Sequence, residues 1–431
     1  MIFDPHAETL DRGAREALQL ERLRSTVAWA VERVAFHRER LGAARLKTLD
    51  DLASLPFMRK SDLREYYPFG LFAVPRAELA RIHASSGTKG KPTLVGYTAD
   101  DLDVWRAVMA RAMTAAGCRR GDTLHVAFGY GLFTGGLGFH DGAERLGMTI
   151  VPVSSGNTAR HILLLQDLQP SGICATPSFA LHIAETFEAQ GGDARALGLR
   201  YGMYGAEPWT EGMRAALERA FGCPAYDVYG LSEIIGPGVA GECEIRDGLH
   251  VADDHFLPEI IDPNTGAVLA AGREGELVLT ALTKRAMPMI RYRTGDITTL
   301  EESPCRCGRT TARIARLKGR SDDMLIIKGV NLYPAEVEAT LLGIADLVPH
   351  YQLVVDRSST LARLEVQVEP APAVVARCGG FDVAHPILVD LQRRVTERLS
   401  KAIGLTVALT LVAPRTVPRS EGKAVRVVER R

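Results

Sequence analysis

The segment HASSGTKGKPTLVGYT, residues 83–98, gathers the residue types that bind polyphosphate. Glycine leaves backbone N–H groups accessible, and neighbouring hydroxyl and ammonium groups add donors and positive charge. The spacing is not that of the common P-loop, because only two residues separate Gly87 from Gly90. The alternative interpretation is a solvated hairpin loop. The residues expected to hold phosphate are Ser85, Ser86, Gly87, Thr88, Lys89, Gly90 and Lys91.

Four further residues have side chains that suit a zinc ion. Cys305 and Cys307 stand in SPCRCGRTT, and Cys243 and His250 stand in GECEIRDGLH. Three thiolates and one imidazole would form a closed tetrahedral site of structural type, with no open position for catalysis. The alternative is two reduced surface cysteines and an unrelated histidine. Seven cysteines, an odd number, argue against a disulfide framework.

The hydrophobic pattern predicts the elements that position these residues. An amphipathic helix is expected over 17–36. Between about 80 and 235, strands such as 124–128 and 149–153 alternate with helices such as 100–116 and 210–221, which favours a largely parallel sheet. Short β-type runs between 249 and 300 indicate a β-rich subdomain. After Arg320 we expect a small α/β unit with helices over 334–342 and 386–403 and strands over 352–356, 363–368 and 405–412.

Length and charge exclude several classes of protein. The chain has 431 residues, and 52 Lys+Arg balance 52 Asp+Glu. A net charge of zero disfavours a dedicated nucleic-acid binder. No apolar run is long enough to span a membrane, and the acidic start MIFDPHAETLDRG does not resemble a secretory signal. We therefore expect a cytoplasmic protein with small-molecule partners and neither nucleic-acid nor membrane partners. A homodimer is compatible with the sequence.

Five further segments stand in a specific order along the chain. They are YGAEPWTE (204–211), YDVYGLSE (226–233), YRTGD (292–296), LKGRSDDMLIIKGVNLYPAEVE (317–338) and PRSEGKAVRV (418–427). Together with the phosphate loop they resemble the signature segments of the adenylate-forming enzymes, in the phenylacetate–CoA ligase branch. The resemblance implies an α/β fold: a large N-terminal domain (1–321) with mostly parallel sheets and a β-rich subdomain, and a small mobile α+β domain (322–431).

The resemblance also implies the chemistry. A carboxylate attacks the α-phosphate of ATP to give an acyl-adenylate and pyrophosphate, and the thiol of coenzyme A then displaces AMP. Because the first step brings two anions together, the site must supply positive charge and aligned donors.

The family's motifs assign roles to individual residues. Glu233 would hold Mg²⁺, and Lys423 would bridge the substrate carboxylate and the α-phosphate. Asp296 would bind the ribose hydroxyls, Arg320 would assist on the ribose or phosphate side, and Asp322 matches the hinge. Considered singly, Glu233 could be an acid at the start of a helix, and Lys423 could be one residue of a basic tail. Asp296 could likewise be a turn residue, and Asp322 an ordinary loop acid. The remaining nucleotide-binding residues are Gly205, Ala206, Glu207 and Pro208 at the adenine, with Tyr229, Gly230 and Ser232.

The segment GYGLFTGGLGFHDGAERLG, residues 129–147, resembles the family's acyl-pocket segment. It departs from the phenylacetate enzymes at Phe139-His140-Asp141, where they have a small residue, His and Tyr. A bulky Phe139 would shorten the pocket and favour a benzoate-sized acid over an arylacetate. Asp141 would accept hydrogen bonds from a ring hydroxyl or amino group, or alternatively it starts a helix. The pocket residues are Tyr130, Phe133, Gly135, Phe139, His140 and Asp141.

These observations leave three functions to separate. The leading one is an AMP-forming aryl-acid–CoA ligase acting on phenylacetate or a hydroxy- or aminobenzoate. Adenylation with a carrier protein, amine or hydroxyl acceptor is the second. A non-catalytic nucleotide-binding, zinc-stabilised interaction protein is the third, and the joint presence of Glu233, Asp296 and Lys423 counts against it.

Overall fold

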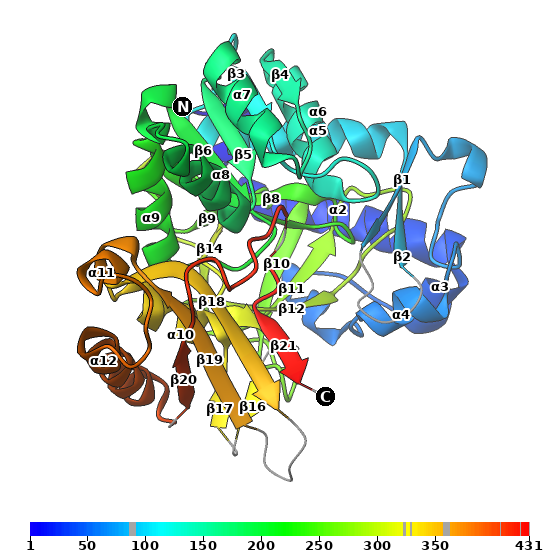
Figure 1. The fold of residues 1–431 in the computed structure, drawn as a ribbon. Coiled ribbons are helices and arrows are strands. Elements are labelled where there is room, and N and C mark those ends of the chain that lie inside the picture. Colours follow the sequence, from blue (N-terminus) through cyan, green and yellow to red (C-terminus); the bar gives the residue numbers. More distant parts are fainter. Residues whose placement is uncertain are drawn as a thin grey trace.

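A computed structural model describes residues 1–85, 92–321, 325–327, 330–356, 363–405, 407–422 and 424–430. Its main feature is a nine-stranded sheet in the order β13-β14-β9-β8-β7-β6-β5-β3-β4 (Figure 1). The five strands from β7 to β4 run parallel, as the alternating pattern predicts. They are β3 (Thr123–Val126), β4 (Thr149–Pro152), β5 (Gly172–Ala175), β6 (Tyr201–Gly205) and β7 (Ala225–Leu231).

The other four strands of this sheet are antiparallel, which the sequence pattern did not indicate. Only residues 232–235 connect β7 to β8, and so short a link permits a hairpin but no crossover. These strands are β8 (Gly236–Glu242), β9 (Leu249–Val251), β13 (Leu300–Glu301) and β14 (Arg313–Ile314).

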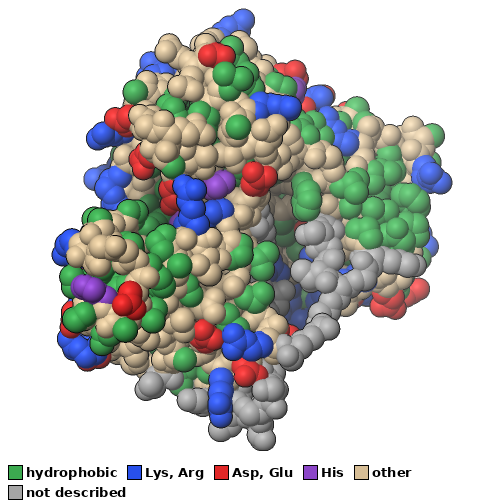
Figure 2. All heavy atoms as spheres, in the orientation of Figure 1, with side chains coloured by type: hydrophobic (Ala, Val, Ile, Leu, Met, Phe, Trp, Pro, Cys, Tyr) green, Lys and Arg blue, Asp and Glu red, His purple; other side chains and the backbone are tan. Residues whose placement is uncertain are grey.

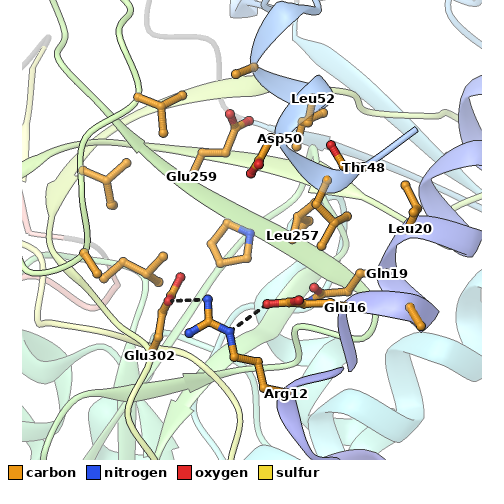
Figure 3. Close-up of a pocket in the computed structure, with 18 of the residues that line it drawn as sticks. Arg12, Glu16, Gln19, Leu20, Thr48, Asp50, Leu52, Leu257, Glu259 and Glu302 are labelled. Carbon is orange, nitrogen blue, oxygen red and sulfur yellow. Dashed lines mark hydrogen bonds and ion pairs between the residues drawn. The ribbon is translucent and has the colours of Figure 1, made fainter. Parts of the chain in front are cut away.

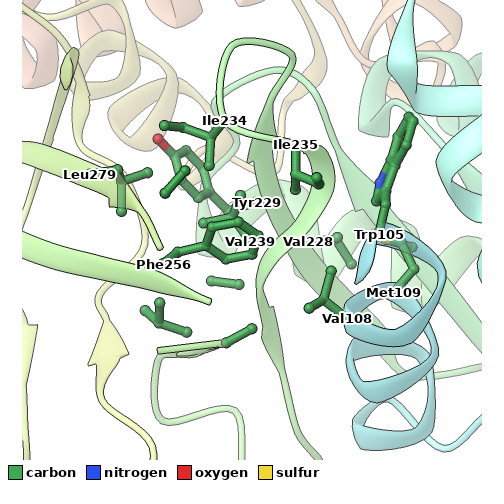
Figure 4. Close-up of a cluster of buried hydrophobic side chains, with 14 of the residues drawn as sticks. Trp105, Val108, Met109, Val228, Tyr229, Ile234, Ile235, Val239, Phe256 and Leu279 are labelled. Carbon is green, nitrogen blue, oxygen red and sulfur yellow. The ribbon is translucent and has the colours of Figure 1, made fainter. Parts of the chain in front are cut away.

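Helices cover the parallel part of the sheet (Figure 1). Trp105, Val108 and Met109 of α5 belong to the main core, in the same cluster as Ile234 and Ile235 (Figure 4). Helix α6 approaches α5 and β8 closely: a Cβ at Gly138 would lie 2.5 Å from Pro237 Cγ, so glycine is required there. The helices are α5 (Ala99–Ala115), α6 (Thr134–Leu146), α7 (Thr158–Leu168), α8 (Pro177–Ala189), η3 (Ala194–Leu197) and α9 (Glu211–Phe221).

The predicted β-rich subdomain is a four-stranded antiparallel sheet of β10 (Phe256–Ile261), β11 (Gly275–Ala281), β12 (Tyr292–Thr298) and β15 (Gly319–Arg320). The first long helix begins earlier than its hydrophobic pattern indicates, because Asp11 caps α2 through Ala14 N. The N-terminal elements are α1 (Pro5–Glu8), α2 (Arg12–Arg33), α3 (Ala35–Leu41), η1 (Leu49–Ser54), α4 (Lys60–Glu65), η2 (Arg76–Glu78), β1 (Arg81–Ser85) and β2 (Thr93–Tyr97).

The C-terminal part has its own hydrophobic core, which runs from Leu325 to Leu411. Its sheet has the order β20-β19-β18-β21, in which only β18 and β19 are antiparallel. The predicted helices and strands are present, and α11, β16, β17 and β21 are additions. The elements are β16 (Leu325–Ile327), β17 (Val330–Leu332), α10 (Pro334–Leu342), β18 (Leu347–Asp356), β19 (Arg363–Pro370), α11 (Pro372–Arg377), α12 (Pro386–Ile403), β20 (Ala408–Leu411) and β21 (Val427–Arg430).

Charged side chains of both signs are interspersed on the face drawn in Figure 2, as a net charge of zero implies. Within the described residues, no helix is both long and apolar enough to cross a membrane.

Candidate active site

A cavity lies at the carboxyl ends of β6 and β7, where open parallel sheets bind ligands. Two features shape it locally. A Cβ at Gly205 would lie 2.2 Å from Val228 O, and Ala206 adopts a left-handed φ of 68°, a strained value for alanine. Eight predicted nucleotide-binding residues line this cavity or its rim: Gly205, Ala206, Glu207, Pro208, Tyr229, Gly230, Asp296 and Arg320.

Asp296 is a buried carboxylate held from two sides. The hydroxyl of Tyr229 donates to Oδ2 at 2.6 Å, and Nη1 of Arg320 donates to Oδ1 at 3.3 Å. Burial and the nearby Asp296 charge raise the pKa of Tyr229, so its proton stays available for donation. The ion pair with Arg320 offsets part of the cost of burying this carboxylate. Asp296 is therefore oriented toward the cavity wall before any ligand arrives.

Glu233 is buried beside two lysines. Lys60 Nζ lies 3.6 Å from Glu233 Oε1, and Lys284 Nζ donates to the Glu233 carbonyl oxygen at 2.9 Å. Lys284 is itself buried, 4.7 Å above the Tyr97 ring, and burial lowers its pKa to about 8. Neither lysine was anticipated from the sequence, because both lie far from Glu233 along the chain.

Ser232, the residue before Glu233, is fixed by the same surroundings. The hydroxyls of Ser232 and Thr134 lie 3.1 Å apart, and the Tyr97 hydroxyl donates to Ser232 O. The loop that carries Ser232 and Glu233 is thus held both through its backbone and through these two side chains.

A second, apolar cavity adjoins the first, which we call the nucleotide cavity after the predicted nucleotide-binding residues that line it. Both are lined by Gly205, Ala206, Val228, Gly230 and Leu231. Phe133, Gly135 and Phe139 of the predicted acyl pocket line it. Phe139 is 1 % exposed and stacks on Phe128 with ring centroids 5.2 Å apart. Among the described residues that line this cavity, none carries a charged side chain.

The other three predicted acyl-pocket residues are not among the residues that line the apolar cavity. Asp141 pairs with Arg81 at 2.7 Å, and it lies within α6, which begins at Thr134. The Tyr130 hydroxyl and His140 Nδ1 lie 3.2 Å apart. The structure therefore brings Tyr130 and His140 together outside the lining of the apolar cavity, and it gives the Asp141 carboxylate a guanidinium partner.

The C-terminal tail (418–427) extends to the large domain, as the red part of the ribbon in Figure 1 shows, and its residue Gly422 lines the apolar cavity. Between described residues, four hydrogen bonds join the tail to the large domain, at the starts of α7 and α8 and in the loop after β6. They link Thr158 Oγ1 to Glu421 Oε1 (3.1 Å), Thr176 Oγ1 to Gly422 O (2.8 Å), Ala424 N to Glu207 Oε2 (2.8 Å) and Arg426 Nη2 to Ser178 Oγ (3.1 Å).

Some predicted residues lie outside the described part of the chain. They are Ser86, Gly87, Thr88, Lys89, Gly90 and Lys91 of the phosphate loop, together with Asp322 and Lys423. Ser85 ends β1, at the edge of the described residues.

The four predicted zinc ligands come together, with ligand atoms all within 4.8 Å of one another. Cys243 Sγ and Cys305 Sγ are 3.9 Å apart, and Cys307 Sγ lies 3.5 Å from His250 Nε2. A tetrahedral zinc with bonds of about 2.3 Å to sulfur and 2.0 Å to nitrogen requires separations of about 3.8 and 3.5 Å. The donor set and its spacing therefore fit a zinc ion.

The surroundings of this cluster also suit a metal. Burial lowers the pKa of His250 to about 3, so the imidazole is neutral, and its Nδ1 faces Thr311 Oγ1 at 3.0 Å. Although burial opposes it, hydrogen bonds from Arg309 lower the pKa of the Cys307 thiol. Arg309 also pairs with Glu8, so the cluster lies beneath the N-terminal segment.

A further cavity lies between α2, η1 and β10, away from the motif residues (Figure 3). Arg12 crosses it between Glu16 and Glu302, at 2.7 and 3.5 Å. None of the residues that line it is a predicted nucleotide-binding, acyl-pocket or zinc-binding residue.

Comparison with known proteins identifies the family of this chain. The family model described as "AMP-binding enzyme" matches residues 19–282, and "AMP-binding enzyme C-terminal domain" matches 329–431. The chain is 50 % identical to phenylacetate–coenzyme A ligase from Thermus thermophilus over 440 aligned positions, covering 99 % of each chain.

A crystal structure of 2-hydroxyisobutyryl-CoA ligase with 2-HIB-AMP, in the postadenylation state, is 30 % identical and superposes with a TM-score of 0.93, covering 100 % of this chain and 92 % of that one. The same ligase with 2-HIB-AMP and CoA, in the thioesterification state, gives a TM-score of 0.72 at 31 % identity, covering 99 % and 91 %. The two domains of this chain are therefore arranged as in the postadenylation state. The chain belongs to the adenylate-forming enzymes, in their phenylacetate–CoA ligase branch, and it is an AMP-forming acid–CoA ligase.

Proposed function

We propose that this ligase activates an unsubstituted aromatic acid of the phenylacetate type as its acyl-adenylate and transfers the acyl group to coenzyme A. The observation that carries the substrate class is the apolar cavity next to the nucleotide cavity, with aromatic walls from Phe128, Phe133 and Phe139 and no charged lining side chain among the described residues. Such a wall suits a bare aromatic ring.

A hydroxy- or aminobenzoate is the second candidate. The bulk of Phe139 favours it, because a shorter acid would fit better into a pocket that this side chain shortens. The ion pair of Asp141 with Arg81 disfavours it, because that carboxylate is engaged elsewhere.

In the first step, a carboxylate oxygen of the acid bonds to the α-phosphorus of ATP, and the bond to the β-phosphate breaks to release pyrophosphate. Asp296, held by Tyr229 and Arg320, accepts hydrogen bonds from the ribose hydroxyls. Lys423 places its ammonium between the two reacting anions, where it stabilises the charge of the transition state. The loop 85–91 holds the β- and γ-phosphates.

Mg²⁺ suits the same site, because the Glu233 carboxylate is a hard oxygen donor, and it directly follows Ser232, which lines the apolar cavity. When bound, the ion neutralises phosphate charge. In this structure Lys60 supplies the charge that balances Glu233.

In the second step, the sulfur of coenzyme A attacks the acyl carbon, its thiol proton leaves, and the bond to AMP breaks. The comparison with two states of 2-hydroxyisobutyryl-CoA ligase supports a different domain arrangement for this step. We assign the hinge to Asp322, between 1–321 and 322–431, from its match to the family's motif. Lys423 would then leave the site.

Acid-dependent ATP–pyrophosphate exchange tests this function, and coenzyme A added afterwards tests the acceptor. We expect exchange with phenylacetate to exceed that with 2-aminobenzoate and 4-hydroxybenzoate. Lys423→Ala should abolish exchange yet form thioester from supplied acyl-adenylate. The absence of exchange with any aryl acid would contradict the substrate class, and product formation only with an amine would contradict the acceptor.

We also propose that Cys243, His250, Cys305 and Cys307 bind one structural zinc ion, which fastens the loop 305–309 to β8 and β9. Metal analysis after dialysis should give about one zinc per chain, and less than about 0.3 would exclude the site.

A further inference from the structure

Glu207 lines the nucleotide cavity, yet its carboxylate is engaged in two hydrogen bonds that point elsewhere. Oε1 accepts from Ser178 N, in the first turn of α8, and Oε2 accepts from Ala424 N, both at 2.8 Å. One side chain therefore joins the start of a helix in the large domain to the backbone of the tail.

The same helix start holds the residue on the other side of position 423. The hydroxyl of Thr176, which caps α8 through Phe179 N, donates to Gly422 O at 2.8 Å. Because Gly422 and Ala424 flank Lys423 in the sequence, the chain is anchored on both sides of that lysine by groups of one small region.

We propose that Glu207 is a positioning residue for adenylate formation, which holds the segment of Lys423 against the active site through the N–H of Ala424. The inference rests on the proposed function, in which Lys423 acts in the first step only. It follows that Glu207 contributes to adenylation and not to thioester formation, because the tail contact is absent once the small domain has moved.

The carboxylate is suited to this task. It accepts both N–H groups at once with its two oxygens, whereas the amide of glutamine has only one acceptor oxygen and presents a donor to the second N–H. Charge-assisted hydrogen bonds of this kind change an equilibrium constant by about tenfold or more when lost. Glu207→Gln should therefore weaken tail docking with little change of side-chain shape.

The experiment compares the two half-reactions in Glu207→Gln, with Glu188→Gln as the matched control on the exposed end of α8. We expect about a tenfold loss in the rate of acid-dependent pyrophosphate exchange, with the KM for ATP within about twofold of wild type. Thioester formation from supplied acyl-adenylate should match wild type, and the control should match wild type in both assays.

A second variant keeps the proposal testable if Glu207→Gln fails to fold. Glu421→Ala removes the contact to Thr158 from an exposed tail residue and should lower exchange by about threefold, again without affecting thioester formation.

Three results would overturn the inference: wild-type exchange in Glu207→Gln and Glu421→Ala, equal losses in both half-reactions, or a rise in the KM for ATP that accounts for the loss. The last would make Glu207 an adenine-contacting residue. Failure of the proposed function is distinct, since exchange would then be absent in wild type or unaffected in Lys423→Ala.

Discussion

The buried lysine beside Glu233 gives a prediction whose size follows from its surroundings. Lys284 is 2 % exposed, and its ammonium contacts the Glu233 carbonyl oxygen and the face of Tyr97. Burial lowers its pKa from 10.5 to about 8, although Asp101 and Glu233 act in the opposite direction. The perturbation is Lys284→Met, which keeps the length of the side chain and removes the titrating amine.

The sign of the pH dependence follows from proton binding. Below pH 8 the amine is protonated in both the folded and the unfolded protein, and the folded state carries the full cost of the buried charge. Between about pH 8 and 10.5 the folded protein has lost this proton while the unfolded chain keeps it, so the free energy of unfolding rises with pH. From pH 7 to 9.5 this group alone adds about 2 kcal/mol of stability.

The assay is urea unfolding followed by tryptophan fluorescence. All three tryptophans, Trp29, Trp105 and Trp209, lie in the large domain, and Trp105 stacks on Tyr97 at 5.2 Å. The free energy of unfolding of wild type minus that of Lys284→Met should increase by about 2 kcal/mol from pH 7 to 9.5.

Lys318→Met controls for the loss of any lysine, because Lys318 is 61 % exposed and pairs with Glu274. Its difference from wild type should not change over this range. A difference between wild type and Lys284→Met that is also constant with pH would refute the argument that burial weakens proton binding at Lys284.

Three further predictions concern the other sites. Asp296→Asn should raise the KM for ATP about tenfold in pyrophosphate exchange with little change in Tm, because the amide cannot serve Tyr229, Arg320 and the ribose together; an unchanged KM would contradict the ribose assignment. Cys305→Ser should release the zinc and lower Tm, whereas Cys378→Ser should do neither, and a metal content equal to wild type in Cys305→Ser would contradict the cluster. Phe139→Ala should shift kcat/KM by about tenfold toward an acid one carbon longer than phenylacetate, and an unshifted preference would show that Phe139 does not bound the pocket.

Local patterns in the sequence predict much of the fold. Alternation of strands and helices predicts the parallel half of the sheet, and the helix over 386–403 has the observed bounds. The grouping of Cys243, His250, Cys305 and Cys307 could also be predicted, because three cysteines and a histidine form a donor set typical of structural zinc. Strand β21 escaped detection: Val427–Arg430 is short and partly exposed, and its pairing with β18 depends on tertiary register.

Contacts between residues that are distant in the chain could not be predicted from the sequence. Nothing local in the sequence joins Lys284 to Glu233, Arg81 to Asp141, or Glu207 to Ala424, since each pair meets only after the sheet and the two domains are assembled. Asp141 illustrates the consequence. Its type and position suggested a contact with a substrate substituent, whereas a guanidinium 2.7 Å away engages the carboxylate.

The nature of the contacts between the tail and the large domain explains how one carboxylate can control a half-reaction. The contacts at Thr158, Thr176, Ser178 and Glu207 are hydrogen bonds to backbone groups or charged side chains of the tail. When the tail leaves, water replaces these partners, so each bond contributes only about 1 kcal/mol net, or up to about 3 when a charged group takes part. A contact surface of this kind holds two arrangements close in free energy, as two sequential reactions require. Among the four, the Glu207 contact is the one in which a charged side chain of the large domain holds the backbone N–H next to position 423, so we expect its loss to affect the docking of that position most directly.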